Sequence, residues 1–221
     1  MTRFARRLSA VIATAVALTL TPAVWADAHS DASVYDFKDP KGVNALLIIM
    51  DSDLEPIVGM ANGISGEVSY DPAKPESLSG SIDLDVQSIQ LSNERMTQVM
   101  RGAGWINAEA FGTITVTFNE VTGVEEEDGD FFIMVNATLE AMGKTLKKEL
   151  EIVVNHYEDG AKERGAAESG DILRLGCVFD VTREELGIKP EMGDRVVADI
   201  IEISVGIVGY EKVAAEDAAE E

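Results

Sequence analysis

Residues 80–112 read GSIDLDVQSIQLSNERMTQVMRGAGWINAEAFG, and this stretch changes character twice. Residues 81–86 alternate between polar and apolar side chains, which is typical of a half-buried β-strand because successive side chains point to opposite faces. Residues 92–101 predict a short, methionine-rich helix, and the aromatic segment 102–112 follows it. Such a helix between the strands of a small antiparallel sheet indicates a cover over the mouth of a barrel.

The rest of the chain from residue 31 onward is dominated by predicted strands that turn residues separate. Residues 113–118 alternate cleanly, and further strands are predicted over residues 43–50, 64–70, 131–139, 146–154, 172–181 and 195–208. The acidic run 125–130 reads as a charged hairpin tip. About eight short strands with few helices predict an all-β domain over residues 31–213, either a sandwich or an antiparallel barrel with one short helix near its mouth.

The two ends of the chain are expected to lie outside this domain. Residues 1–26 carry Arg3, Arg6 and Arg7 before an apolar run, and small residues then offer a cleavage site after Ala26 or Ala28. This pattern predicts a signal peptide and export, most simply to a bacterial periplasm. The apolar run is short for a membrane span, and the alternative is an uncleaved N-terminal anchor. Residues 214–221 predict a disordered acidic tail.

The charge of the chain excludes several kinds of partner. Without the three arginines of residues 1–26, 15 basic residues face 40 acidic ones, a formal charge of −25. Nucleic-acid binding needs clusters of Lys and Arg that this chain lacks, so no nucleic acid is expected as a partner. Adhesion to anionic lipid headgroups is disfavoured for the same reason.

Residues that could carry catalysis or hold a metal are scarce. Cys177 is the single cysteine and lies in an apolar run, so it reads as a small buried residue and less well as a catalytic thiol. His29 and His156 are far apart and outside any ligand-like cluster. The acidic run 125–130 lacks the ligand spacing of a calcium loop. We therefore expect a binding protein without catalytic residues or a metal, rather than an enzyme.

The predicted helix supplies candidate residues for a binding site. Met96, Val99 and Met100 fall at helical spacing and share one face. Either this face packs as core over the open end of the sheet, or its flexible methionines line an apolar mouth together with Trp105 and Phe111.

Two arginines of this helix, Arg95 and Arg101, are conspicuous in so acidic a chain. Each either meets the head group of a ligand or pairs with surrounding carboxylates. A closed barrel of about eight strands either fills with side chains or holds one small or slender ligand. The inward strand residues expected to line such a cavity, or its packed equivalent, are Leu84, Val86, Ile114, Val116 and Phe118.

Several segments occur in the order known from one protein family. They are GISGEVSYD (63–71), IDLDVQSI (82–89) followed by NERM (93–96), WINAEAFGTI (105–114), ATLEAMGKT (137–145), and FDVTREELGI (179–188) with GDRV (193–196). In this order the chain resembles the YceI-like family. The resemblance implies an exported, lipocalin-like antiparallel barrel whose cavity holds an isoprenoid lipid, such as a polyprenyl phosphate or an isoprenoid quinone, and it implies no catalytic residues.

The chain departs from the family pattern at three places. Residues 39–43 read DPKGV where the family commonly has Asp-x-x-His-Ser, Met96 follows Arg95 where an Asp is usual, and Gly112 follows Phe111 where a Pro is usual. These changes remove polar groups that would position a head group, which leaves Arg95 as the candidate. We expect a monomeric or dimeric carrier without a membrane span. The alternatives are a packed barrel without lipid that serves as an interaction or stress protein, and an enzyme acting on a lipid-linked substrate.

Overall fold

The computed structural model describes residues 32–166, 169–189 and 191–212. The predicted signal peptide (1–26) and acidic tail (214–221) lie outside the described residues.

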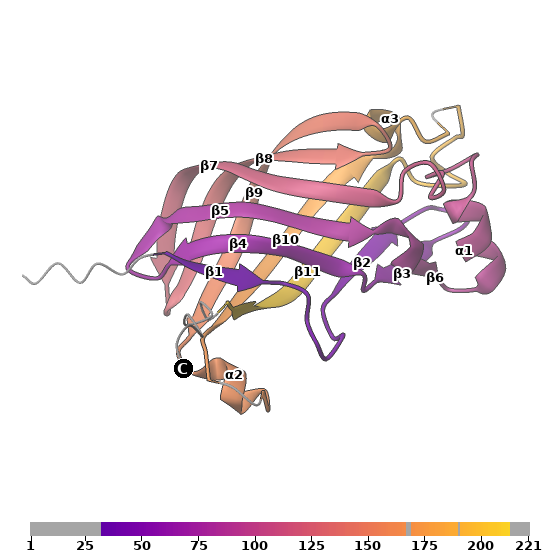
Figure 1. The fold of residues 1–221 in the computed structure, drawn as a ribbon. Coiled ribbons are helices and arrows are strands. Elements are labelled where there is room, and N and C mark those ends of the chain that lie inside the picture. The colour runs from indigo at the N-terminus through magenta and orange to yellow at the C-terminus, as the bar shows by residue number, and fades with distance from the viewer. Residues whose placement is uncertain (1–31, 167–168, 190, 213–221) are drawn as a thin grey trace, which may run out of the picture.

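Eight antiparallel strands form a closed ring, because the first strand pairs with both β4 and the last strand. In ring order they are β1 (Ser33–Asp36), β4 (Ile64–Asp71), β5 (Lys74–Asp85), β7 (Thr113–Glu127), β8 (Asp130–Ala141), β9 (Lys144–Tyr157), β10 (Ile172–Thr182) and β11 (Ile200–Glu211). The predicted all-β antiparallel barrel is confirmed (Figure 1).

Three further strands widen the sheet at one end of the ring. They are β2 (Ala45–Met50), β3 (Ile57–Ala61) and β6 (Gln90–Leu91). The last strand, β11, pairs with β1 through residues 210–211 and with β2 through residues 202–206. The same edge of β11 therefore pairs with the ring strand β1 in one half of the barrel and with the additional strand β2 in the other half.

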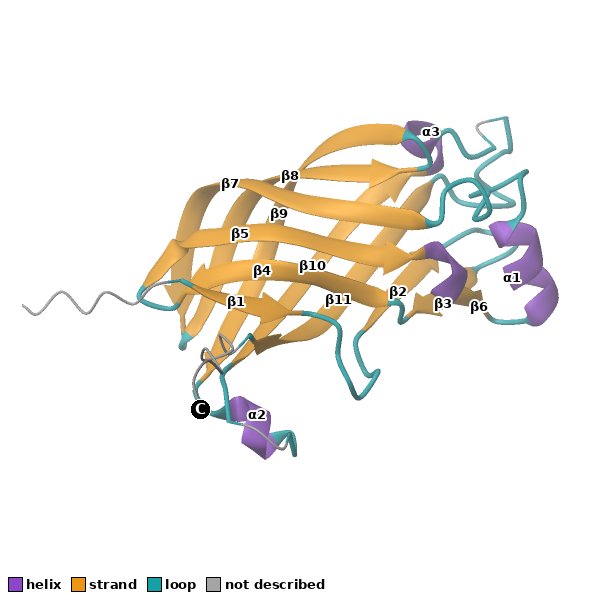
Figure 2. Cartoon of the chain, in the orientation of Figure 1, coloured by secondary structure: helices purple, strands orange, loops and turns teal. Residues whose placement is uncertain are grey.

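The described residues include four short helices: η1 (Val86–Ser88), α1 (Glu94–Arg101), α2 (Gly160–Glu163) and α3 (Arg183–Leu186). Helix α1 lies beside β3 and β6 at one end of the barrel (Figure 2). We call this end the mouth, and we call the opposite end, where the β4–β5 and β7–β8 turns lie, the base. The short helix predicted over residues 92–101 is confirmed, and it begins two residues later.

The base half of the barrel is filled with side chains. Its inward residues are almost completely buried: Tyr35, Val68, Tyr70, Ile133, Val135, Val154, Leu173 and Ile207. Burial raises the pKa of the Tyr70 hydroxyl to about 12, so this hydroxyl is neutral. Tight packing of this kind is the main favourable contribution to the fold.

Two of the β-hairpin turns use residues with positive φ, which favours tight two-residue hairpins. Asp128 and Gly129 (φ 52° and 90°) join β7 to β8, so the acidic run 125–130 forms the predicted hairpin tip. Met142 and Gly143 (φ 47° and 72°) join β8 to β9 at the mouth.

Several predicted strands differ from the structure in their boundaries. Strand β5 begins at Lys74 rather than at residue 81, and β7 continues to Glu127 rather than ending at residue 118. The last strand differs as well. The sequence pattern extends from residue 195, but β11 begins at Ile200. Residues 195–199 belong instead to a loop, whose described residues are 187–189 and 191–199, because the Arg183 side chain donates hydrogen bonds to the carbonyls of Ile188, Lys189 and Val197. A contact with another part of the chain overrides the local alternation there.

Candidate functional site

The mouth half of the barrel contains a cavity of about 360 Å³. Its wall is made of inward apolar residues from both the ring and the additional strands. Representative members are Leu46, Ile48, Ile82, Leu84, Ile114, Val116, Phe179, Ile201, Ile203 and Val205. Cavities of this size and character are typical of sites for apolar small molecules.

Only three charged residues are found among the described residues that line the cavity: Glu55, Arg95 and Arg183. Glu55 and Arg95 are exposed at the mouth. The Arg95 guanidinium makes no hydrogen bond or ion pair with any residue that the structure describes, so it is available to a ligand. We call the edge of the cavity at the mouth, where Glu55 and Arg95 lie, the rim. Below the rim, Arg183 is the one ionisable residue among the described residues of the wall.

The Arg183 side chain is only 1% exposed, yet its charge is fully compensated. Its guanidinium donates hydrogen bonds to five backbone carbonyls, among them those of Ala198 (2.9 Å) and Lys189 (2.6 Å), and lies 3.6 Å from the Asp194 carboxylate. A buried cation is tolerated only with such partners. Arg183 therefore organises the rim loop 187–199 and is not free to bind a ligand.

Helix α1 is fixed at the mouth by polar contacts at both of its ends. The Asn93 side chain caps its N-terminus by accepting a hydrogen bond from the amide of Met96 (2.9 Å). At the other end, Arg101 donates from Nε and Nη2 to the carbonyl of Ile89 (3.1 and 2.6 Å). Arg101 thus binds backbone rather than a carboxylate or a ligand head.

Eight of the eleven residues that the sequence nominates line the cavity: Leu84, Arg95, Met96, Val99, Met100, Trp105, Ile114 and Val116. The two methionines are half-buried against the core, and Val99 is 52% exposed. The structure therefore brings the helix face, the tryptophan and the strand residues together around one space.

The other three nominated residues lie outside the cavity wall. Val86 is completely buried at the start of η1, below the rim. Phe111 stacks over the β8–β9 turn, where a Cβ on Gly143 would lie 3.2 Å from its ring. Phe118 is the next inward residue of β7 after Val116, and it is packed in the core.

Sequence reasoning missed the contribution of β2 and β3 to the wall. Leu46, Ile48 and Met50 point inward from β2, and Ile57 points inward from β3. The continuous apolar run of β2 gave no indication of which alternate residues face the cavity. It also missed Arg183, because a single arginine in an acidic chain reads as a surface residue.

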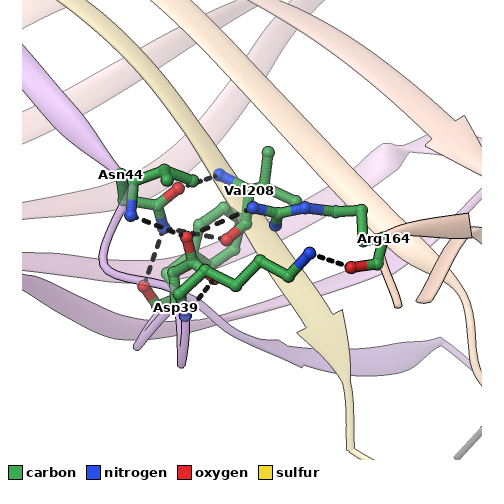
Figure 3. A network of polar contacts seen from close by, with 7 residues as sticks. Asp39, Asn44, Arg164 and Val208 are labelled. Carbon is green, nitrogen blue, oxygen red and sulfur yellow. Dashed lines mark hydrogen bonds and ion pairs between the residues drawn. The ribbon is translucent and has the colours of Figure 1, made fainter. Parts of the chain in front are cut away.

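The departure from the family pattern at residues 39–43 lies outside the cavity wall. Its Asp39 belongs to the network of polar contacts in Figure 3. The Asp39 carboxylate accepts hydrogen bonds from the amides of Lys41 and Val43 and pairs with Arg164 (3.2 Å). Although burial alone would raise the pKa of Asp39, these hydrogen bonds and the Arg164 guanidinium lower it. This segment supports the β1–β2 connection, so its altered residues do not change the cavity.

The cysteine and the described histidine show no sign of chemistry. Cys177 faces the interior, and burial raises the pKa of its thiol to about 11, which disfavours the reactive thiolate. His156 contacts the Asp171 carboxylate (3.0 Å) and the edge of the Tyr35 ring, away from the cavity. Within the described part of the chain, no group of three or more His, Cys, Asp or Glu side chains could hold a metal ion.

Comparison with known proteins places this barrel in a family. The model of the YceI-like domain matches residues 39–208. The chain belongs to the YceI-like family. A UPF0312 protein of Shewanella baltica is 30% identical to this YceI-like chain over 184 residues, which cover 82% of this chain and 90% of the relative.

Solved structures share the fold at low sequence identity. BcnA of Burkholderia cenocepacia superposes on this YceI-like barrel with a TM-score of 0.59 at 19% identity, covering 75% of this chain and 95% of BcnA. A Campylobacter jejuni YceI protein gives a TM-score of 0.58 at 14% identity and 74% and 88% coverage. A polyisoprenoid-binding domain from Saccharophagus degradans gives 0.58 at 10% identity, covering 82% and 99%. No helix in the described ranges is long and apolar enough to cross a membrane.

Proposed function

We propose that this YceI-like protein binds an isoprenoid lipid, a polyprenyl phosphate or an isoprenoid quinone, with the apolar chain in the mouth cavity. The observation that carries the proposal is the character of the wall, which is apolar below a rim that bears two exposed charged side chains. Burial of an apolar chain stabilises such a complex by about 25 cal/mol per Å². The polyisoprenoid-binding neighbour of the same fold supports this choice of ligand class.

The polar head of the ligand remains at the mouth in this proposal. Arg95 is exposed there and has no partner among the described residues, so it is the residue that meets a phosphate or carbonyl oxygen. Glu55 lies on the same rim, and the mature chain carries a large negative charge, which disfavours a strongly anionic head. These charges favour the quinone over the polyprenyl phosphate.

The two alternative functions are less well supported. A packed barrel without ligand would leave no space in the mouth half, whereas about 360 Å³ is open there. An enzyme would need ionisable groups that converge inside the cavity, and the guanidinium of Arg183 is occupied by backbone carbonyls. We therefore infer a carrier rather than a catalyst. The N-terminal pattern of residues 1–26 adds the inference that this carrier acts in a periplasm.

The chain contains its own reporter for testing this proposal. Of its two tryptophans, Trp25 belongs to the predicted signal peptide and Trp105 lines the cavity. In protein that starts after residue 26, a bound quinone should quench the fluorescence of Trp105 in a saturable manner. Native mass spectrometry of the same protein, followed by solvent extraction, should identify any lipid that is carried from the cell.

The role of Arg95 is tested with a matched arginine. Arg95→Gln should weaken a polyprenyl phosphate roughly fivefold and a quinone less, because only the phosphate loses a full charge pair. Arg195→Gln removes another exposed arginine, which does not line the cavity, so it should change neither affinity. The proposed function would be wrong if solvent extraction of the purified protein released no lipid and neither ligand quenched Trp105 in a saturable manner.

A further inference from the structure

The cavity ends partway along the strands of the ring. Along β7, Ile114 and Val116 line it, but the next inward residue, Phe118, does not. Along β11, Val205 lines it and Ile207 does not. Since β7 and β11 lie on opposite sides of the eight-stranded ring, these end points mark a floor across the interior.

Phe118 is the large side chain of this floor. It lies opposite Gly80 on β5 and opposite Ala137 on β8, the two smallest neighbours it could have. Gly80 (φ +134°) has no room for a side chain, because a Cβ would lie 2.2 Å from the carbonyl oxygen of Glu67. The phenyl ring therefore occupies space that its neighbours leave open, and it is only 8% exposed.

Beneath Phe118 the described side chains of the ring leave the cavity no continuation. The inward residues of the next levels, Val135 and Ile133 on β8 and Leu173 on β10, are completely buried. A void large enough for a chain would leave part of these side chains accessible. The base is thus closed to an apolar chain that enters from the mouth.

The depth of the cavity follows from the strand geometry. Ile201 and Val205 bound the lined part of β11, and four residues at about 3.4 Å each give about 14 Å along the strand. A strand tilt of about 40° reduces this to about 11 Å along the barrel, and α1 at the rim adds about 10 Å. An extended isoprene unit of four carbon–carbon bonds spans about 5 Å, so the cavity accommodates about four units.

We propose that the cavity selects isoprenoid chains of about four units and that Phe118 sets this limit. This inference rests on the proposed function, because it specifies which isoprenoid lipid the site takes. A longer chain would leave its remaining units outside the barrel. Those units would gain no contact with the wall and would be held less well than in a micelle or a membrane.

The test uses benzoquinones that carry two, four or nine isoprene units, presented in a fixed concentration of a nonionic detergent. Quenching of Trp105 reports binding, since this residue lines the cavity. The apparent affinity should be highest for four units and at least about tenfold lower for nine, because the additional units favour the micelle. An affinity that continues to rise up to nine units would overturn the length limit and leave the proposed function standing. Absence of quenching by all three quinones would overturn the proposed function itself.

Two variants move the floor in opposite directions. Phe118→Ala removes the ring and should raise the affinity ratio of nine to four units at least about tenfold. Val205→Phe fills the lower cavity and should shift the preference from four units to two. The second variant adds bulk to open space, so it keeps the test decisive if thermal unfolding shows that Phe118→Ala is not folded.

The matched control is Phe111→Ala. Phe111 is also an aromatic residue of the mouth half, but it packs on the β8–β9 turn outside the cavity wall. Its removal should leave the length preference unchanged. The assignment of the floor would be overturned if Val205→Phe and folded Phe118→Ala both left the length preference unaltered. It would also be overturned if Phe111→Ala changed the preference as much as they do.

Discussion

The base and the mouth of this barrel are built by the same strands and differ in what fills them. In the base, inward residues such as Ile133 and Val135 are completely buried against their neighbours. In the mouth, Ile114 and Val116 face an open cavity although they occupy equivalent inward positions. A single ring of strands thus provides stability at one end and an apolar space at the other, and the two functions can be altered separately.

The two ends also differ in how they are held together. The base relies on packing, which is non-directional and distributed over many side chains. The mouth is closed by loops and short helices, and these are positioned by a few polar residues such as Arg183, Arg101 and Asn93. We therefore expect single polar substitutions to matter most at the mouth and single apolar substitutions to matter most at the base.

The largest effect should come from Arg183→Met. The methionine fills much of the same space but leaves carbonyls of the rim loop 187–199 without their donor. A buried polar group that loses its hydrogen-bond partner costs about 1–3 kcal/mol, so the carbonyls left without a donor should together cost about 3–5 kcal/mol. Urea unfolding should show this loss, and amide hydrogen exchange should show it concentrated in residues 187–199.

The matched control for Arg183 is Arg195→Met in the same rim. Arg195 is 79% exposed and pairs only with the exposed Asp53 carboxylate, so its removal should change stability by less than about 1 kcal/mol. Equal effects of the two substitutions would mean that the buried guanidinium does not organise the rim.

The contrast between base and mouth is tested directly with two isoleucines. Ile133→Ala removes atoms from a fully packed site and should cost about 3–4 kcal/mol. Ile48→Ala removes the same atoms from a wall that already borders open space, and it should cost about 1 kcal/mol. The affinity for a quinone, measured by quenching of Trp105, should show the reverse order. It should change in Ile48→Ala and stay the same in Ile133→Ala. Equal costs for both variants would show that the mouth is packed in solution.

Strand β7 shows how much of the division between packed base and open mouth the sequence predicts. The alternation of residues 113–118 correctly predicts that Ile114, Val116 and Phe118 share the inward face. It does not predict that the cavity ends between Val116 and Phe118. That boundary depends on Gly80 and Ala137, which lie far away in the sequence and meet Phe118 only through strand pairing.

The helix at the mouth was more predictable than the rim around it. Asn93 and the spacing of Met96, Val99 and Met100 define a capped helix with one apolar face, and both are local signals. The rim loop 187–199 has no such signal, because its conformation depends on Arg183 and on backbone carbonyls. The family resemblance identified the closing segment that contains Arg183, but it gave this residue no role.

The junction between the two halves depends on Asn44. This residue is 3% exposed and lies where β11 changes its partner from β1 to β2. Its amide donates to the carbonyls of Phe37 (3.0 Å) and Val208 (2.9 Å) and accepts from the amide of Val208 (2.9 Å), in place of a missing strand residue (Figure 3). Asn44→Ala should lower stability by about 2 kcal/mol, because three backbone groups, all buried or partly buried, lose their partner.

A suitable control for Asn44 is Asn136→Ala, which removes only an exposed, long contact with Glu120 (3.4 Å). It should change stability by less than about 0.5 kcal/mol. Hydrogen exchange at the amide of Val208 should accelerate in Asn44→Ala alone. If the exchange rate there is unchanged, the side chain does not complete the ladder and the two halves are joined by other contacts.

The smallest effect concerns the gap between β9 and β10 in the mouth half. These strands pair only through residues 153–157 and 172–176, and α3 contacts both of them. The Lys148 ammonium lies 2.8 Å from the Glu185 carboxylate, which also accepts from the amide of Thr182 (2.8 Å). The hydrogen bond from Lys148, followed by that from Thr182, lowers the pKa of Glu185.

A lowered pKa in the folded state fixes the sign of the pH dependence. The contribution of Glu185 is complete above its unfolded pKa of about 4.3 and is lost as the pH falls through the lower folded value. Because the pair is partly exposed, Glu185→Gln should lower stability at pH 7 by less than about 1 kcal/mol, and the difference should vanish in acid. Glu184→Gln on the same short helix removes the same charge without a side-chain partner, so it should not reproduce this pH dependence. If both variants follow the same curve, relief of repulsion in this acidic chain explains the effect, and the gap between β9 and β10 is closed by the apolar contacts of α3 rather than by the ion pair.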